Sequence, residues 1–358
     1  MIDPESRAIE WIDEVHSNYK KLDKSLIEKS IRAFSLLESL VLSGCPFVFK
    51  GGTCVMLHLD SSSRVSVDID IICPPGTDIA SYVEKNSAEY GFTGVKLIER
   101  KGRNDVPKSH AKFFYKISYK TNAEEGNVLL DVLFEDIHYS KVERLPIRSR
   151  FLKNIGEDVY VQVPSIEDIL GDKMTAFAPH TTGIPYYKGE NPAFLEVIKQ
   201  MYDIATLSER VKDLALVRET FMKFVKVELG YRNAEGMSVE DVLKDTINTA
   251  LTLSLRGVIN KEEFDMLQSG IKRIDGFIVS ERYLLDSAIR DAAKAAYMAV
   301  LILSGTDEII PFSLERAKES PGMKVLHAKL NKLKKTNIEA FYYWSMADSL
   351  LQNYTATK

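Results

Sequence analysis

The chain has 358 residues, a hydrophobic fraction of 45% and a charged fraction of 27%, which is ordinary composition for a globular protein with room for two or more cores. Its net charge of −4 and pI near 6.0 exclude a protein that coats nucleic acid by bulk charge, so any RNA contact must be a local patch. The acidic N-terminus and the lack of a long apolar run predict a cytoplasmic protein with no membrane partner.

Apolar residues recur at helical spacing in two stretches before the first strand. They predict helices over residues 4–19 and 24–43. The apolar run 46–49 then predicts a fragment of a buried strand, and the run 55–59 predicts a short helix. The chain therefore passes from strand to helix within a few residues.

That connection has the sequence Lys50-Gly51-Gly52-Thr53. Glycines let the backbone approach a ligand closely, and a helix N-terminus offers N–H groups and a positive dipole, to which the threonine adds a hydroxyl. The connection therefore predicts a phosphate-binding site. A glycine pair is also common in plain turns, so this motif alone does not decide between the two interpretations.

The next stretch, Val65–Ile71, alternates apolar and polar residues and predicts a strand whose polar face carries Ser66, Asp68 and Asp70. Two carboxylates on one face repel, and each raises the pKa of the other unless a divalent cation neutralises them, which predicts a Mg²⁺ site. In isolation such a pair is more often a solvated strand face. Placed after a phosphate-binding connection, it predicts a nucleotide site in which metal bridges protein and triphosphate.

A basic stripe is predicted further along the chain. After a turn at residues 74–76, the pattern predicts a helix over 79–90, a strand over 92–100 and a strand over 112–120, in which lysines take one face. The basic residues of this region are Lys96, Arg100, Lys101, Arg103, Lys108, Lys112, Lys116 and Lys120. Such a stripe fits either an exposed sheet edge protected by lysines or a surface for an RNA backbone.

The following strand, predicted over 127–136, places Leu129, Asp131 and Leu133 on one face. An acid flanked by leucines is costly to desolvate without a partner, and a metal shared with Asp68 and Asp70 would supply one. An acid at a strand end that faces water is the alternative.

Two predicted helices carry further charged residues. A strand over 159–163 leads into a helix that begins near Ser165, and Lys173 lies on its apolar stripe, where it either snorkels to solvent or reaches an anion. A second helix, which opens at Pro192, carries Lys199 and Asp203 one turn apart.

From about residue 210 the pattern is helical to the C-terminus. The predicted helices cover 214–229, 238–255, 261–274, 280–303, 311–317 and 338–351. The predicted fold class is therefore α+β, with a small mixed sheet flanked by helices and a helical C-terminal domain. We expect residues 1–165 to form the catalytic domain, and residues 166–358 to contribute Lys173, and Lys199 with Asp203, to its cleft.

The motifs resemble those of a known family. KGGT followed by RVSVDIDI is similar to the first motif of the DNA polymerase β-type nucleotidyltransferases, and particularly to the AbiEii/AbiGii toxin branch, which includes MenT-like toxins. The resemblance covers residues 45–207. It implies a nucleotidyltransferase core with an NTP as substrate, and a toxin of a toxin–antitoxin or phage-defence pair with a cognate antitoxin.

The resemblance also implies roles for single residues. The superfamily takes a third carboxylate from a strand at about Asp131, and a lysine on the helix of Lys173 contacts the nucleotide phosphates. A family pattern R-D-x-Y-D corresponds here to Lys199-Gln200-Met201-Tyr202-Asp203, in which Gln200 replaces the first aspartate. Asp203 is therefore either a catalytic acid or a partner in a structural ion pair.

The expected chemistry follows from this site. Two Mg²⁺ ions held by Asp68, Asp70 and Asp131 would align an acceptor hydroxyl with the α-phosphate of an NTP, with Asp131 as the base. The groups expected to hold the phosphates are Lys50, Gly51, Gly52, Thr53, Arg64, Ser66, Lys173 and Lys199.

The resemblance implies an RNA acceptor, with the tRNA 3′ end as the specific candidate. One alternative is a small molecule such as an aminoglycoside, which would need a compact acidic pocket. Another is a protein side chain, for example in the serine-rich stretch 60–63 of this chain. A non-catalytic nucleotide- or RNA-binding protein is a third; the intact acids count against it, and Gln200 counts in its favour.

Overall fold

The computed structural model divides the chain into two compact units, Met1–Ser165 with Gly276–Glu281, and Ile166–Asp275 with Arg282–Lys358. The structure describes residues 1–59, 64–83, 85, 88–101, 107–118, 125–232, 234, 236–279 and 282–357, and the side chains of residues 83, 98–101, 107–110 and 357 lie outside this description.

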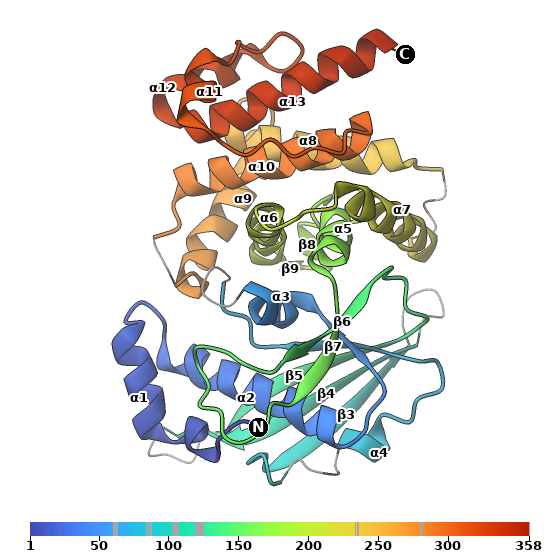
Figure 1. The fold of residues 1–358 in the computed structure, drawn as a ribbon, viewed down its shortest axis with the longest axis vertical. Coiled ribbons are helices and arrows are strands. Elements are labelled where there is room, and N and C mark those ends of the chain that lie inside the picture. The colour runs from blue at the N-terminus through green and yellow to red at the C-terminus, as the bar shows by residue number, and fades with distance from the viewer. Residues whose placement is uncertain are drawn as a thin grey trace. The chain divides into compact units, whose positions relative to one another are not determined.

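The first unit contains the sheet and the helices around it (Figure 1). Its elements in chain order are η1 (Pro4–Arg7), α1 (Ile9–Asn18), α2 (Lys24–Leu42), β1 (Val48–Lys50), α3 (Gly51–Leu59), β2 (Ile69–Cys73), α4 (Ala80–Val83), β3 (Gly94–Lys101), β4 (Pro107–Lys116), β5 (Glu125–Phe134), β6 (Val142–Pro146) and β7 (Tyr160–Pro164). The predicted α+β class, with a small mixed sheet flanked by helices, is confirmed.

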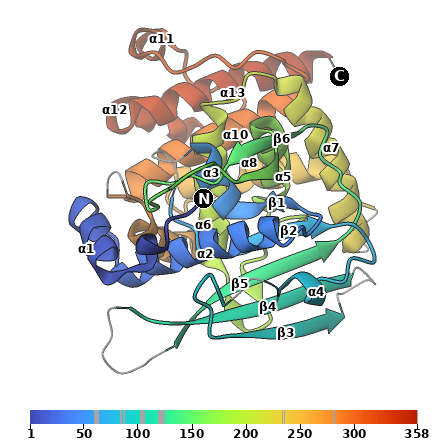
Figure 2. The ribbon, with the colours of Figure 1, turned by 60° about the horizontal axis from the view of Figure 1, so that its bottom comes forward.

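The main sheet has five strands in the order β1-β2-β5-β4-β3. Strand β2 runs parallel to β5, and the other neighbouring pairs are antiparallel. Figure 2 shows β5, β4 and β3 side by side, with β3 at the outer edge. The two central strands, β2 and β5, are therefore the ones that carry the predicted acids, while β1 brings the glycine pair to the side of β2.

The sheet has one buried face and one half-exposed face. Helix α2 packs against β2 and β5, and the buried face includes Ile69, Phe113 and Leu130, each 0% exposed. On the other face Asp70 and Asp131 are half-buried, as is Lys112. The alternation of the sequence thus correctly assigned these strand residues to two faces, because successive side chains point to opposite sides of a strand.

The predicted strand over Val65–Ile71 is wrong at its start, because β2 begins only at Ile69. The residues before it are bonded elsewhere: the Val65 amide donates to the Phe277 carbonyl at 2.8 Å, and the Ser66 amide contacts Met56 Sδ at 3.0 Å. Asp68 therefore lies on the segment just before the strand rather than within it.

The predicted helix over 79–90 is also wrong in extent, because α4 spans only Ala80–Val83 and residues 88–91 form turns. Tyr90, within these turns, is buried, and its hydroxyl donates to Glu38 Oε2 of α2 at 3.0 Å. Strand β6 was not predicted. It pairs with β7 in a separate two-stranded sheet.

The second unit is helical apart from one short hairpin. Its elements are α5 (Ile166–Ala176), β8 (Tyr187–Lys188), β9 (Asn191–Pro192), α6 (Phe194–Ser208), α7 (Leu214–Tyr231), α8 (Val239–Ser254), α9 (Lys261–Ile274), α10 (Leu285–Ser304), α11 (Leu314–Glu319), η5 (Ala328–Lys332), α12 (Leu333–Thr336) and α13 (Ile338–Thr357); the turn η4 (Asp275–Phe277) lies at the boundary of the units. Across the described residues, the helices are all too short or too polar to cross a bilayer.

Local signals in the sequence begin several of these helices. Asp213, Ser238 and Asn260 each accept a hydrogen bond from the first turn of the helix that follows, and Ser238 forms a reciprocal capping box with Asp241. Such caps satisfy backbone N–H groups that have no partner within the helix. This explains why the predicted start of α9 at Lys261 is confirmed to the residue.

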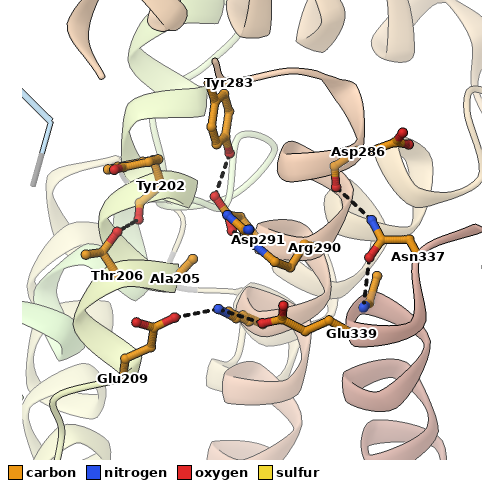
Figure 3. A network of polar contacts seen from close by, with 12 residues as sticks. Tyr202, Ala205, Thr206, Glu209, Tyr283, Asp286, Arg290, Asp291, Asn337 and Glu339 are labelled. Carbon is orange, nitrogen blue, oxygen red and sulfur yellow. Dashed lines mark hydrogen bonds and ion pairs between the residues drawn. The ribbon is translucent and has the colours of Figure 1, made fainter. Parts of the chain in front are cut away.

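Helix α10 joins its neighbours through a partly buried polar network, which Figure 3 shows. Asp291 accepts hydrogen bonds from the Tyr283 hydroxyl at 2.8 Å and from Arg290 Nε at 3.0 Å. One turn further along, Lys294 Nζ lies 2.6 Å from Glu209 Oε1 and 3.1 Å from Glu339 Oε1. These ion pairs connect α10 to residues at the end of α6 and the start of α13.

Candidate active site

The glycine pair and Asp70 lie against one another. Strand β1 ends at Lys50, the register partner of Asp70, and α3 begins at Gly51 with a φ of +79°. A Cβ atom at Gly51 would lie 2.0 Å from Asp70 Oδ2, so any side chain here would displace the carboxylate. Only glycine combines this left-handed backbone with such a close approach. The predicted strand-to-helix connection thus packs directly against the Asp70 carboxylate.

The second glycine faces two other predicted residues. A Cβ atom at Gly52 would lie 2.7 Å from Ser66 Oγ and 2.8 Å from Arg64 Nη2. Arg64 is only 4% exposed, although it is a charged side chain. The start of α3 therefore has a guanidinium and a hydroxyl beside its backbone, which together can bind an anion.

Thr53 is completely buried, and its hydroxyl donates to the Asp68 carbonyl at 2.6 Å. This bond joins the first turn of α3 to the segment that precedes β2. Because it fixes the backbone of Asp68, Thr53 aligns the acidic segment with the glycine pair.

Two of the three predicted acids are neighbours across the sheet. Asp70 and Asp131 are register partners on the parallel strands β2 and β5. Neighbouring strands lie about 4.8 Å apart, so the two half-buried carboxylates share one small region of the half-exposed face. The positions predicted from two separate stretches of sequence are thereby brought together.

The third acid has a neighbour that the sequence did not indicate. Asp68 Oδ1 lies 3.8 Å from Lys29 Nζ, a residue of α2. Within the described residues, no group of three or more His, Cys, Asp or Glu side chains is arranged to hold a metal ion. Nothing in the local sequence of α2 marked Lys29, because the contact joins residues far apart in the chain.

The predicted residues of the second unit form a compact cluster of their own. Lys173 Nζ on α5 lies 2.9 Å from Asp203 Oδ2 and 2.9 Å from Gln200 Oε1, both on α6. Asp203 is 1% exposed and Lys173 is also buried, whereas Lys199 is half-exposed. Gln200, which departs from the family pattern, is therefore a direct partner of Lys173. The acidic residues belong to the first unit and this cluster to the second.

The predicted basic stripe lies partly within the described residues. Lys112 and Lys116 share the half-exposed face of β4, and Phe113 and Tyr115 are buried on the other face. Lys96 on β3 is exposed and is the register partner of Lys112. The remaining predicted members, Arg100, Lys101, Arg103, Lys108 and Lys120, lie outside the residues whose side chains the structure describes.

Comparisons with known proteins agree with the motifs. Residues 35–283 match the model of a family described as nucleotidyl transferase AbiEii toxin, type IV toxin–antitoxin system. A candidate nucleotidyltransferase from H. pylori, known from a crystal structure, is similar at 17% identity and a TM-score of 0.42, over 78% of this chain and 96% of that one; a likeness this weak carries no argument. A search of curated proteins finds no match.

Proposed function

This chain belongs to the AbiEii family of nucleotidyltransferase toxins of type IV toxin–antitoxin systems, and from that premise we propose that it transfers a nucleoside monophosphate from an NTP to an RNA acceptor in a Mg²⁺-dependent reaction. The observation that carries the proposal is the position of Asp70, which lies against the Gly51 backbone and in register with Asp131. A glycine-containing strand-to-helix turn and a pair of carboxylates thus meet in one place. The family membership sets aside the alternative of a non-catalytic binding protein.

The acidic residues suit Mg²⁺ by their chemistry. Carboxylate oxygens are the hard donors that Mg²⁺ prefers, and Asp70 and Asp131 present two of them side by side. Asp70, Asp131 and Asp68 are not grouped around one metal position in the described part of the chain. In this proposal Asp70 and Asp131 would hold two Mg²⁺ ions, and Asp68 would join them once its side chain turns from Lys29. Bound Mg²⁺ supplies charge neutralisation for the triphosphate and for the pyrophosphate that leaves.

The phosphates of the NTP are bound, in this proposal, at the start of α3. The Gly51 and Gly52 backbone lets a phosphate approach the N–H groups of the helix, and Arg64 and Ser66 lie beside it. Lys50, at the end of β1, adds a positive charge next to Asp70. Thr53 acts on this site through its hydrogen bond to the Asp68 backbone.

The transfer step needs a base and an open path for the acceptor. The acceptor hydroxyl oxygen forms a bond to the α-phosphorus of the NTP, the bond to the pyrophosphate oxygen breaks, and the hydroxyl proton moves to Asp131. Asp131 is suited to this role because it is half-exposed and next to Asp70. This step requires no oxidant or other co-reactant.

In the second unit, we propose that Lys173 and Lys199 bind phosphate when the NTP is present. Asp203 and Gln200 hold the Lys173 ammonium at 2.9 Å, so they position it rather than act on the substrate. Asp203 thereby takes the role of an ion-pair partner.

The acceptor we propose is RNA, with the tRNA 3′ end as the specific candidate. Lys96 and Lys112 lie on the sheet in the strands beyond Asp131, and basic residues there favour a polyanion over a cationic small molecule. The alternative acceptor within the chain, the serines of residues 60–63, lies outside the described residues. We also expect a cognate antitoxin, as the family implies.

The test is to incubate the purified protein with each α-labelled NTP, Mg²⁺ and total RNA. We compare wild type with Asp70→Asn and Asp131→Asn, and use Asp136→Asn, an exposed acid just after β5, as the matched control. We expect label in a tRNA-sized band with wild type and the control, and a loss of about 10³-fold in both site variants. Label on the protein or on an added aminoglycoside would select an alternative acceptor, and no label anywhere would refute the proposal.

A further inference from the structure

The half-exposed face of the sheet carries two lysines that lie directly opposite each other. Lys96 on β3 and Lys112 on β4 are register partners in an antiparallel pair, where opposing side chains are neighbours. Like charges in this position destabilise the pair unless an anion lies near them. None of the ion pairs formed among the described residues includes either lysine. Lys116 differs, because its register partner is Glu125.

An aromatic side chain lies on the same face as these lysines. Phe114 is two residues from Lys112 on β4 and is half-exposed, in contrast to its buried neighbours Phe113 and Tyr115. Its register partner on β3 is Gly94, which has no side chain, and a Cβ atom built there would meet nothing within 4 Å. One side of the Phe114 ring is therefore bordered by open space.

This face leads directly to the candidate active site. Lys112 is the register partner of Leu129, and Leu129 shares its face of β5 with Asp131, two residues further on. With about 4.8 Å between strands and about 3.4 Å per residue along them, the lysines lie roughly 8 to 12 Å from Asp131. The two lysines and Phe114 thus lie outside the reacting centre. A polymer whose end is bound at Asp131 can still contact them.

We propose that Lys96, Lys112 and Phe114 form an acceptor-binding surface that holds the nucleotides preceding the terminal one in single-stranded RNA. The lysines bind the phosphate backbone, and a base stacks on Phe114 in the space beside Gly94. The inference rests on the proposed function, because it assumes an RNA acceptor. An acidic polypeptide would satisfy the lysines but would make no use of the aromatic ring, which is why RNA is the occupant we assign.

The first experiment measures binding of a fluorescein-labelled single-stranded RNA of about twelve nucleotides. We expect Lys96→Gln/Lys112→Gln to weaken binding about tenfold at low salt and to reduce the slope of log K against log salt by about 1.4. Phe114→Leu should weaken binding at least about fivefold and leave the slope unchanged. NTP affinity should not change in either variant, and removal of the opposed charges should not lower thermal stability.

Matched controls come from the same unit. Lys20→Gln/Lys141→Gln removes the same charge from exposed lysines elsewhere, and Tyr160→Leu removes a half-exposed ring from β7. Both controls should bind RNA as wild type does. Transfer to a dinucleotide acceptor, which is too short to reach the surface, should be unaffected by Lys96→Gln/Lys112→Gln, whereas kcat/KM for tRNA should fall about tenfold.

The outcomes separate this inference from the function on which it rests. If wild type labels RNA but the surface variants bind and label it like the controls, the surface is refuted and the proposed function stands. If wild type neither binds nor labels RNA, both fall. If poly-glutamate displaces the RNA at equal charge concentration and Phe114→Leu has no effect, the surface binds an acidic protein, and the assignment to RNA is overturned.

Discussion

Carboxylates lie in two contrasting settings in this protein. Asp70 and Asp131 are half-exposed neighbours on the sheet, whereas Asp291 in the helical unit is buried and accepts hydrogen bonds from Tyr283 and Arg290 (Figure 3). The buried acid has dedicated donors and joins elements of the fold. The neighbouring acids on the sheet concentrate negative charge where a ligand can reach it. Burial, rather than residue type, thus separates a structural acid from a candidate catalytic one.

The largest effect on stability is expected from Asp291→Ala. The change leaves the Arg290 side chain and the Tyr283 hydroxyl without their buried partner, and should lower the free energy of unfolding by about 3 to 5 kcal/mol. Denaturant unfolding measures this loss. The control is Asp286→Ala, which removes an exposed acid near the start of α10. An equal loss of stability in both variants would show that the burial of Asp291 does not determine its contribution.

The next largest effect is expected at Lys173, which forms a buried ion pair and is also proposed to bind phosphate. Lys173→Met leaves Asp203 buried without its ion pair and should cost about 3 kcal/mol of stability. If Lys173 also binds phosphate, KM for the NTP should rise, and Lys173→Met/Asp203→Leu should recover stability without recovering KM. Recovery of both by the double variant would show that the lysine has a structural role only.

A smaller loss is expected from Gly51→Ala. Gly51 and Gly44 both have positive φ, but a Cβ atom at Gly44 meets nothing within 4 Å, whereas one at Gly51 meets Asp70. Gly44→Ala should therefore cost about 1 kcal/mol from backbone strain alone. Gly51→Ala should cost about 2 kcal/mol and also reduce transferase activity, because it displaces the Asp70 carboxylate. Equal effects of the two variants on activity would show that the close approach of Gly51 to Asp70 does not matter for transfer.

Replacing Asp131 on the sheet should affect the free energy of unfolding much less than replacing Asp291. Asp131 is half-exposed, so Asp131→Asn should change the free energy of unfolding by less than about 1 kcal/mol in the absence of metal. Saturating Mg²⁺ should stabilise wild type and have little effect on the variant. Thermal unfolding with and without Mg²⁺ tests this, and a wild-type midpoint that does not respond to Mg²⁺ would count against the metal assignment.

The smallest expected effect is a pH dependence from a second buried acid. Burial raises the pKa of Asp245 above its ordinary value, although the Thr181 hydroxyl and the His180 amide donate to its carboxylate. The folded state therefore binds this proton more tightly than the unfolded state, and the stability contributed by Asp245 falls as pH rises through that range. Relative to Asp245→Asn, wild type should lose stability as the pH rises from below the ordinary carboxylate pKa through the raised pKa of Asp245, which denaturant unfolding at a series of pH values measures. A constant difference across this range would be inconsistent with the raised pKa.

The sequence predicted the elements whose signals are local. Alternation assigned Asp70 and Lys112 to the half-exposed face and Ile69 and Phe113 to the buried one, and helical spacing placed the start of α9 at Lys261. The family motif extended this to a nucleotidyltransferase, which the match over residues 35–283 confirms. These features depend on neighbours one to four residues away, so a linear pattern contains them.

Features that depend on distant partners were missed. Strand β2 starts late because the Val65 amide donates to the Phe277 carbonyl, more than two hundred residues away. The turn at residues 88–91 holds Tyr90, whose hydroxyl donates to Glu38, another partner far away in the sequence. The contact between Lys29 and Asp68 left no trace in the local pattern for the same reason. The open space beside the Phe114 ring was also missed, because it depends on the strand register that places Gly94 opposite Phe114.

By itself, the sequence determined which residue types were available for chemistry and which face of each strand or helix they occupy, because side-chain direction follows from chain periodicity. Only the tertiary structure decided which of those faces meet. The strand order β1-β2-β5-β4-β3 places Asp70 beside both Gly51 and Asp131 and sets the lysines one and two strands beyond. Strand order depends on pairing between segments far apart in the chain, and periodicity within one segment contains no information about its partner.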